Sequence, residues 1–183
     1  MGVIVAITGA TGAVYGVRLL EFLKKLDIET HLVVSQWAVN TLHMETAYSL
    51  EELKTMATCF YDSNDLGAAI SSGSFKTDSM VIAPCSMKTL AAISCGISVN
   101  LIHRAADVTL KEGRKLIIVP RETPLSPIHL ENMLKLSRMG VVMMPPMPAF
   151  YNHPVSLDDI VNHHVGRILD RLQIEHDSIR RWQ

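Results

Sequence analysis

The chain has 183 residues, 48% of them hydrophobic and 19% charged, and a formal net charge of −1. This length predicts one domain spanning residues 1–183, and the balanced charge favours no nucleic-acid partner. Its three cysteines form no C-x-x-C pair, which argues against a disulfide scaffold or zinc site and favours a reducing compartment. Without a run of about 18 apolar residues or a basic segment leading into an apolar stretch, we expect neither membrane span nor signal peptide and interpret the protein as cytoplasmic.

The first part of the chain is predicted to be a strand followed by a glycine-bearing turn and a helix. Residues 3–8 are apolar and rich in β-branched side chains, which indicates a buried parallel strand. Gly9, Gly12 and Gly16 follow, and a strand, a glycine turn and a helix start together can bind a phosphate. Their spacing does not match the dinucleotide pattern G-x-G-x-x-G. The wider opening, with the Thr11 hydroxyl inside it, favours a single phosphate, although a tight turn without a ligand is the alternative.

Strand-like and helix-like segments alternate along the rest of the chain. Further strands are expected at residues 29–34, 59–61, 79–84, 115–120 and 141–144. Further helices are expected at residues 36–47, 87–93, 100–114 and 127–139, with a short one after Ser49 and a long amphipathic one after Ser156. The alternation predicts a three-layer α/β domain, Rossmann-like or flavodoxin-like, with a mostly parallel sheet and helices on both faces. The polar, glycine-bearing segment 62–77 is a candidate binding loop.

In such folds, ligands bind at the carboxyl ends of the strands, so the residues that follow each strand are the candidates. These strand ends read Gly9-Ala10-Thr11, Ser35, Pro84–Thr89, Pro120–Pro124 and Pro145–Tyr151. Five strand ends with hydroxyls, small residues or a charged pair are typical of a ligand-binding edge.

Several of these residues have a structural explanation as well as a functional one. Ser86 and Thr89 begin a helix, where capping and ligand contact use the same free N–H groups. Arg121 offers a planar fork for a phosphate and Glu122 a group that exchanges a proton, but the pair could be a surface salt bridge. Tyr151 follows a proline-stiffened turn and could instead pack in a subunit contact.

Other chemistry-bearing residues are given simpler interpretations. Arg167 has the position of an exposed charge on the last helix. His163 and His164 are adjacent and point to different sides of that helix, so they cannot chelate a metal as an i, i+4 pair would. Cys85 follows a buried strand and is interpreted as an inert thiol. Ten methionines and a low charged fraction suggest that other subunits cover part of the surface.

Five segments together resemble the UbiX family of flavin prenyltransferases, whose members were formerly called phenolic acid or 3-octaprenyl-4-hydroxybenzoate decarboxylases. They read TGATGAVYGVRLLE, APCSMKTLAAISCGIS, LIHRAADVTLKEGRKLIIVPRETPLS, HLENMLKLSRMGVVMMPPMPAFYNHP and VGRILDRL. The resemblance covers nearly the whole chain, and the combination of VPRETPLS with PPMPAFY is its most specific part.

This resemblance implies an FMN-binding domain in a homododecamer whose active sites lie where subunits meet. It implies transfer of a dimethylallyl group from dimethylallyl monophosphate to N5 of reduced FMN, with ring closure at C6 and no metal. The product would be the cofactor of a UbiD-type decarboxylase.

The resemblance also assigns roles residue by residue. Flavin contacts fall on Gly9, Ala10, Thr11, Ser35, Ser86, Met87, Lys88, Thr89 and Arg121. Contacts with the phosphorylated substrate fall on Lys111, Arg121, Glu122, Tyr151 and Arg167, with Trp182 near the prenyl group and Glu45 matching a family acidic residue. The tail, about residues 175–183, is expected to contact a neighbouring subunit. One departure is the turn GATG where the family commonly has GASG, so Thr11 adds a methyl group beside the flavin.

These roles are chemically consistent. Lys111, Arg121, Arg167 and the Tyr151 hydroxyl would hold the charge that grows on a departing phosphate. Glu122 would supply a proton to the departing phosphate, and the π faces of the flavin and Trp182 would shield an allylic cation. The alternative function is direct, FMN-dependent decarboxylation of a phenolic or hydroxybenzoic acid. A flavin-storage or peptidyl-cysteine decarboxylase-like flavoprotein is a further alternative, which the three cations disfavour because an uncharged substrate would not require them.

Overall fold

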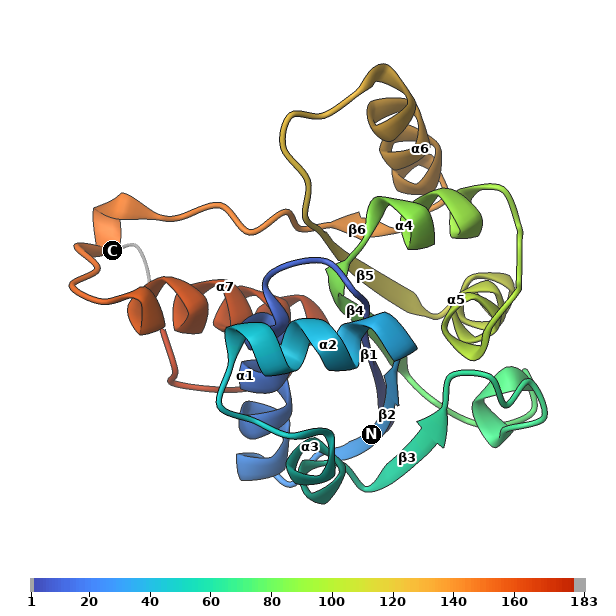
Figure 1. Ribbon diagram of the computed structural model, residues 1–183, viewed down its shortest axis with the longest axis horizontal. Helices are drawn as coiled ribbons and strands as arrows, with labels where there is room; N and C mark the ends of the chain where they lie inside the picture. The colour runs from blue at the N-terminus through green and yellow to red at the C-terminus, as the bar shows by residue number, and fades with distance from the viewer. Residues whose placement is uncertain (1, 180–183) are drawn as a thin grey trace.

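The computed structural model describes residues 2–179 and contains a six-stranded sheet with helices on both faces (Figure 1). The strands are β1 (Gly2–Ile7), β2 (Glu29–Val34), β3 (Cys59–Asp62), β4 (Ser79–Cys85), β5 (Lys115–Pro120) and β6 (Val142–Met143). Their order is β3-β2-β1-β4-β5-β6, the doubly wound order of the Rossmann fold. The α/β prediction is confirmed. The sequence predicted a mostly parallel sheet, and every described strand pairing is parallel.

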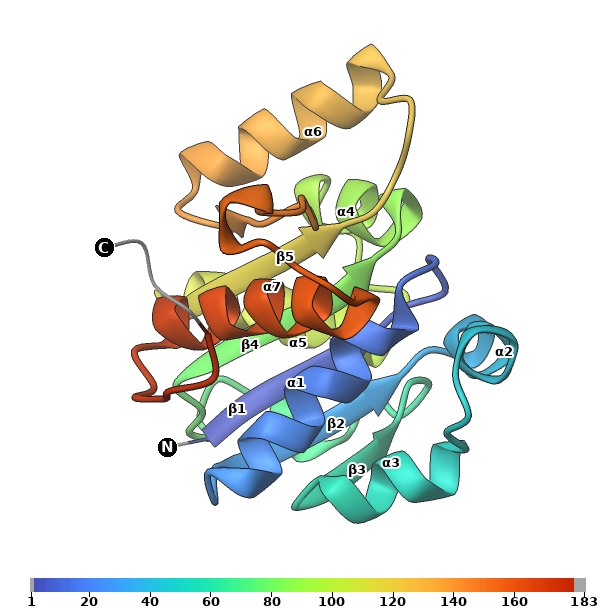
Figure 2. The ribbon, with the colours of Figure 1, turned by 90° about the vertical axis from the view of Figure 1, so that its left-hand side faces the viewer.

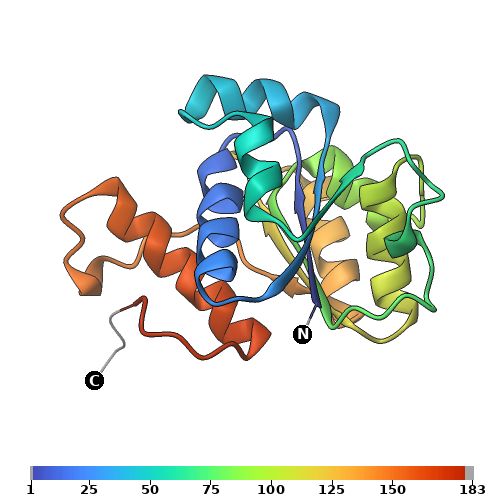
Figure 3. The same cartoon turned by 90° about the horizontal axis from the view of Figure 1, so that it is seen from below.

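Helices cover the two faces of the sheet as separate groups. They are α1 (Ala13–Lys25), α2 (Gln36–Glu45), α3 (Leu50–Met56), α4 (Met87–Ser94), α5 (Leu101–Lys111), α6 (Pro127–Arg138) and α7 (Leu157–Leu172), with 3-10 turns η1 (Ala69–Ser71) and η2 (Phe150–Asn152). Figure 3 shows α1 and α7 on one side of the sheet and α4, α5 and α6 on the other. Each face has its own hydrophobic core, which is why the central strand β4 is buried along its whole length.

The capping residues read from the sequence begin the helices as expected. Ser49, Ser86 and Ser156 each accept a hydrogen bond from the third backbone N–H of their helix. The expected helix 100–114 is shorter, because Gly113 follows it at φ +66°, outside the helical region. Similarly, only residues 142–143 of the expected strand 141–144 pair with β5.

All strands point toward the same edge of the sheet, where the loops after β1, β2, β4 and β5 gather (Figure 2). Helix α1 begins at this edge between β1 and β4, the point at which the strand order reverses. Gly16 lets α1 lie close to the sheet, since a Cβ there would overlap the carbonyl oxygen of Ala83 on β4. The sequence therefore places a helix start directly over the expected ligand-binding edge.

Beyond β6 the chain leaves the sheet as an extended arm, residues 144–149, which leads into η2, and then returns as α7 against α1 (Figure 1). The described part of the tail packs on its own α7, where a Cβ at Gly166 would overlap Ile179. The His176 ring is buried there and lies 3.2 Å from an oxygen of Asp170. Trp182 lies outside the described residues, so the expected subunit contact of the tail stays a prediction. In residues 2–179 no helix is both long and apolar enough to span a bilayer.

Candidate functional site

A large cleft at the carboxyl edge has a volume of about 700 Å³ and brings together residues from five strand ends or helix starts. Five of its lining residues are predicted flavin contacts: Gly9, Ser35, Ser86, Lys88 and Thr89. Of the other predicted flavin contacts, Ala10 lies in the same turn as Gly9, and Met87 is buried in the first turn of α4. This volume lies within the range of small-molecule sites, about 300–1,000 Å³.

Three helices begin at this cleft, which gives it a positive potential. The caps of α2, α4 and α5 are Ser35, Ser86 and Asn100, and each accepts a backbone hydrogen bond, at 3.3, 3.3 and 2.9 Å respectively. Helix starts carry a partial positive charge. The Lys88 ammonium adds a full charge, and no partner within residues 2–179 neutralises it. The cleft therefore suits a ligand with an anionic group such as a phosphate.

Trp37 forms a wall of the cleft that the sequence analysis did not identify. Its side chain is 69% exposed, and its Cδ1 would lie only 2.5 Å from a Cβ added to Gly9. Gly9 thus leaves the space that the indole occupies. The sequence signal for it is a tryptophan two residues after Ser35, at the expected carboxyl edge of the sheet.

The turn between Gly9 and Gly12 binds an anion, but the anion is a side chain of the same protein. The Glu45 Oε2 atom accepts hydrogen bonds from the backbone N–H groups of Gly12 at 2.7 Å and Ala13 at 2.9 Å. The other carboxylate oxygen accepts a hydrogen bond from the Thr11 hydroxyl. The predicted phosphate-binding start of α1 is therefore filled by a carboxylate, and the helix starts that face the large cleft are those of α2, α4 and α5.

A second cleft of about 420 Å³ lies on the other side of this turn and contains Arg121 and Glu122. Thr11, Gly12 and Tyr15 contribute one wall, and Pro145–Met147 contribute the opposite one. The Arg121 guanidinium is exposed and has no acidic partner within residues 2–179, so the pair is not the salt bridge considered as an alternative. Glu122 instead accepts a hydrogen bond from the Thr123 backbone at 3.0 Å. The turn 9–12 thus borders two adjacent clefts.

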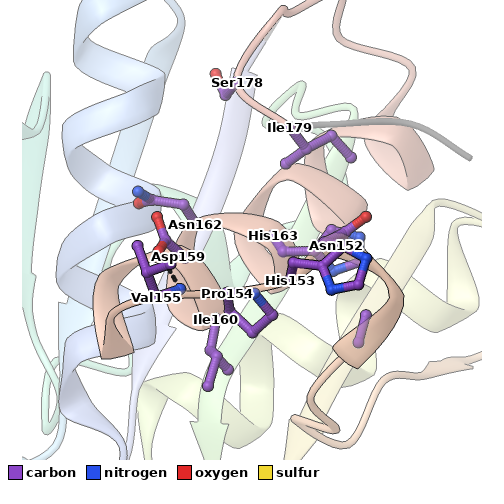
Figure 4. Close-up of a pocket in the computed structure, with 11 residues that line it drawn as sticks. Asn152, His153, Pro154, Val155, Asp159, Ile160, Asn162, His163, Ser178 and Ile179 are labelled. Atoms are coloured by element: carbon purple, nitrogen blue, oxygen red, sulfur yellow. Dashed lines mark hydrogen bonds between the residues drawn. The ribbon is translucent and has the colours of Figure 1, made fainter.

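Tyr151 and Arg167 lie outside both clefts. The Tyr151 hydroxyl is 3.3 Å from Nε2 of His163, and Arg167 is 3.2 Å from a carboxylate oxygen of Asp170. His163 lines a third cavity, of about 320 Å³, between η2, the start of α7 and Ser178 and Ile179 (Figure 4). The structure therefore places Tyr151 and Arg167 with α7 and not beside Arg121.

Lys111 lies at the opposite edge of the sheet. It ends α5 just before β5 begins at Lys115, whereas Arg121 follows the end of β5, so the two are separated by the length of the strand. The Lys111 ammonium pairs with Glu112. The cations predicted to hold one phosphate therefore occupy three separate places in a single chain.

The Cys85 thiol is fully buried, and this burial raises its pKa, which fits the interpretation of an inert thiol. Within residues 2–179 no three histidine, cysteine, aspartate or glutamate side chains are arranged to hold a metal ion.

The doubly wound parallel sheet and the helix starts at its carboxyl edge define a nucleotide-binding α/β protein. A family model described as Flavoprotein matches residues 1–169, so the chain belongs to the flavoprotein family. A probable UbiX-like flavin prenyltransferase of Escherichia coli O157:H7 is 59% identical over 184 residues, covering 100% of this chain and 93% of the relative. This full-length likeness confirms the resemblance to UbiX.

Two solved structures agree with this assignment. A dodecameric FMN-dependent UbiX-like decarboxylase from E. coli O157:H7 superposes with a TM-score of 0.98 at 59% identity, covering 100% of both chains. AnUbiX (PadA1), in complex with FMN and dimethylallyl pyrophosphate, also superposes with a TM-score of 0.98, at 48% identity, covering 100% of this chain and 97% of that one.

Proposed function

We propose that this protein is a flavin prenyltransferase that joins a dimethylallyl group from dimethylallyl monophosphate to N5 and C6 of reduced FMN. The observation that carries the proposal is the pair of clefts that share the turn 9–12. One has three helix starts and Lys88, and the other has Arg121 beside the carboxylate of Glu122. Two adjacent sites with anion-binding groups suit a reaction between two phosphorylated substrates.

The large cleft is the proposed FMN site. Its size suits a flavin. The positive potential at its helix starts suits the phosphate of that flavin, with Ser35, Ser86 and Thr89 as hydroxyl donors. The AnUbiX structure, which holds FMN together with dimethylallyl pyrophosphate, supports a site for both substrates in this fold. We propose the monophosphate as the donor here.

The second cleft is the proposed prenyl-donor site. Reduced FMN supplies the nucleophilic N5 and C6 atoms. The Arg121 guanidinium would hold the donor's phosphate as the allylic C–O bond breaks, because a preorganised cation stabilises the charge that develops there. Glu122 would give a proton to the departing phosphate oxygen. Thr11 lines this cleft and its hydroxyl is bonded to the Glu45 carboxylate, and the pair would orient the reacting groups.

Lys111, Tyr151 and Arg167 would reach this site from neighbouring subunits of a homododecamer. Supporting this, the solved E. coli relative is a dodecamer, and large apolar side chains are exposed on α6 and around η2 and the start of α7. They include Ile128, Leu134, Phe150, Val155 and Leu157. Such a surface is typical of a subunit interface. We further propose a cytoplasmic enzyme that delivers its product to a UbiD-type decarboxylase.

The test is an anaerobic incubation with reduced FMN and dimethylallyl monophosphate, comparing Glu122→Gln with the control Glu51→Gln, an exposed residue of α3 that lines neither cleft. Loss of a general acid should slow formation of the flavin adduct by about 10²–10⁴-fold in the first variant only. An unchanged rate would remove Glu122 from the mechanism. Release of CO₂ from a hydroxybenzoate by the purified protein and FMN, without a partner enzyme, would favour the decarboxylase instead.

A further inference from the structure

His103 is a buried histidine in the wall of the large cleft, and none of the predicted site residues accounts for it. It is the third residue of α5 and only 3% exposed, and its backbone N–H is bonded to the Asn100 cap at 2.9 Å. Its Nδ1 atom is buried and has no hydrogen-bond partner among the described residues. Buried polar atoms are almost always paired, so His103, which lines the cleft, lacks the hydrogen bond that would hold a purely structural histidine in place.

The surroundings of the ring are positively charged. Burial lowers the pKa of His103, and the nearby Lys88 ammonium lowers it further. Lys88 lines the same cleft from the start of α4, and the residues that line it include no acidic side chain within the described part of the chain. On α5 itself, Arg104 is paired with Asp107 at 2.7 Å. The ring is therefore neutral in the ligand-free cleft, beside one ammonium and the positive ends of α4 and α5.

We infer that His103 binds the phosphate of FMN and takes up a proton from solvent when it does so. A neutral imidazole donates one hydrogen bond, whereas a protonated one donates two. A phosphate dianion at the adjacent helix starts favours the charged ring and reverses the effect of Lys88. No covalent bond between heavy atoms is made or broken, and one proton moves from solvent to the ring. This inference rests on the proposed function, which assigns FMN to this cleft.

The role has two consequences that a purely structural histidine lacks. His103 makes the cleft select FMN over riboflavin, which has the same ring system and no phosphate. It also couples binding to pH: FMN affinity rises as the pH falls, because the complex binds one more proton than the free protein does. Riboflavin affinity does not change in this way.

The experiment measures binding of FMN and of riboflavin to the assembled protein by titration calorimetry at several pH values. It uses buffers of different ionisation enthalpy, which report the protons taken up. His103→Gln is compared with His43→Gln, which removes an exposed imidazole on α2 that does not line the cleft. Loss of a hydrogen bond to a charged group is expected to weaken FMN binding by about 10- to 100-fold in His103→Gln. Riboflavin binding and the control variant should match the wild type.

Two outcomes would overturn the inference. One is FMN affinity that His103→Gln leaves unchanged, or weakens no more than riboflavin affinity. The other is wild-type FMN binding without proton uptake, a measurement that needs no variant and so holds even if His103→Gln fails to assemble. Failure of the proposed function gives a different result, namely a wild-type protein that binds FMN but forms no adduct with dimethylallyl monophosphate.

Discussion

The Glu45 carboxylate lies across the start of α1 and is bonded to the Thr11 hydroxyl and to the backbone N–H groups of Gly12 and Ala13. Glu45 is the last residue of α2, so this contact ties the end of α2 to the start of α1, beside the second cleft that Thr11 and Gly12 line. The carboxylate is held in one orientation by three donors, which is the condition for a side chain that must meet a substrate in a fixed geometry.

The rate of adduct formation is expected to depend on the hydroxyl of Thr11 rather than on its methyl group. Thr11→Ser keeps the bond to Glu45 and should keep the rate of adduct formation close to that of the wild type. Thr11→Val keeps the shape of the side chain but removes the hydroxyl donor. Loss of this hydrogen bond to a charged group should lower the rate of adduct formation by about 10- to 100-fold. Single-turnover kinetics with reduced FMN measure both variants. Equal rates for the Ser and Val variants would show that the hydroxyl has no role.

Gly9→Ala should weaken FMN binding through Trp37. The added Cβ would lie 2.5 Å from Cδ1 of the indole, which must move, and both residues line the large cleft. The double variant Gly9→Ala/Trp37→Ala removes the clash, so its FMN affinity should exceed that of Gly9→Ala. Fluorescence titration with FMN measures this, with Trp37→Ala alone as the control. A double variant that binds no better than Gly9→Ala would show that the clash with the indole is not what weakens FMN binding.

His164 should make the fold sensitive to mild acid. Burial lowers its pKa to about 4, and the neighbouring His163 acts in the same direction; the His164 ring packs edge-on against Tyr15. Because the unfolded chain binds this proton at about pH 6.5 and the folded one does not, stability falls as the pH drops from about 6.5 toward 4. The loss is about 3 kcal/mol at the lower end.

His164→Phe retains a ring against Tyr15 and has nothing to protonate. Its thermal midpoint should fall less between about pH 7 and about pH 4.5 than that of the wild type, at a fixed protein concentration. His43→Phe, which alters an exposed imidazole, serves as the control. Parallel pH profiles for wild type and His164→Phe would contradict this account of His164.

Lys111 and Glu122 lie at opposite ends of β5, so a single site that uses both must take them from two subunits. Lys111→Ala and Glu122→Gln should each be inactive as pure assemblies. Co-expressed with different tags and purified as mixed assemblies, they should regain activity, because some sites then contain both native residues. A mixed assembly as inactive as its parents would place Lys111 outside the site or both residues in one subunit.

The parts of the fold that follow from local pattern could be predicted from the sequence. Apolar runs indicated the strands, and Ser49, Ser86 and Ser156 indicated helix starts, because capping depends on a few adjacent residues. The way in which the site residues are divided between separate places in one chain could not be predicted. The family pattern joins Arg121 and Lys111 in one site, but their places depend on the order of the strands and on contacts between subunits, which no local pattern encodes.

Two lining residues were missed for related reasons. Trp37 and His103 follow strand or helix boundaries, where a side chain can face either solvent or a cleft. Their orientation depends on how α2 and α5 pack, which is a tertiary property. The filled start of α1 was missed too, because its partner Glu45 is 33 residues away from Gly12 in the sequence.

The most direct test of the central claim is the mass of the flavin recovered after anaerobic incubation of the wild-type protein with reduced FMN and dimethylallyl monophosphate. The account predicts FMN enlarged by one isoprene unit, with free phosphate released in equal amount. Recovery of unmodified FMN from a protein that binds both molecules would contradict it.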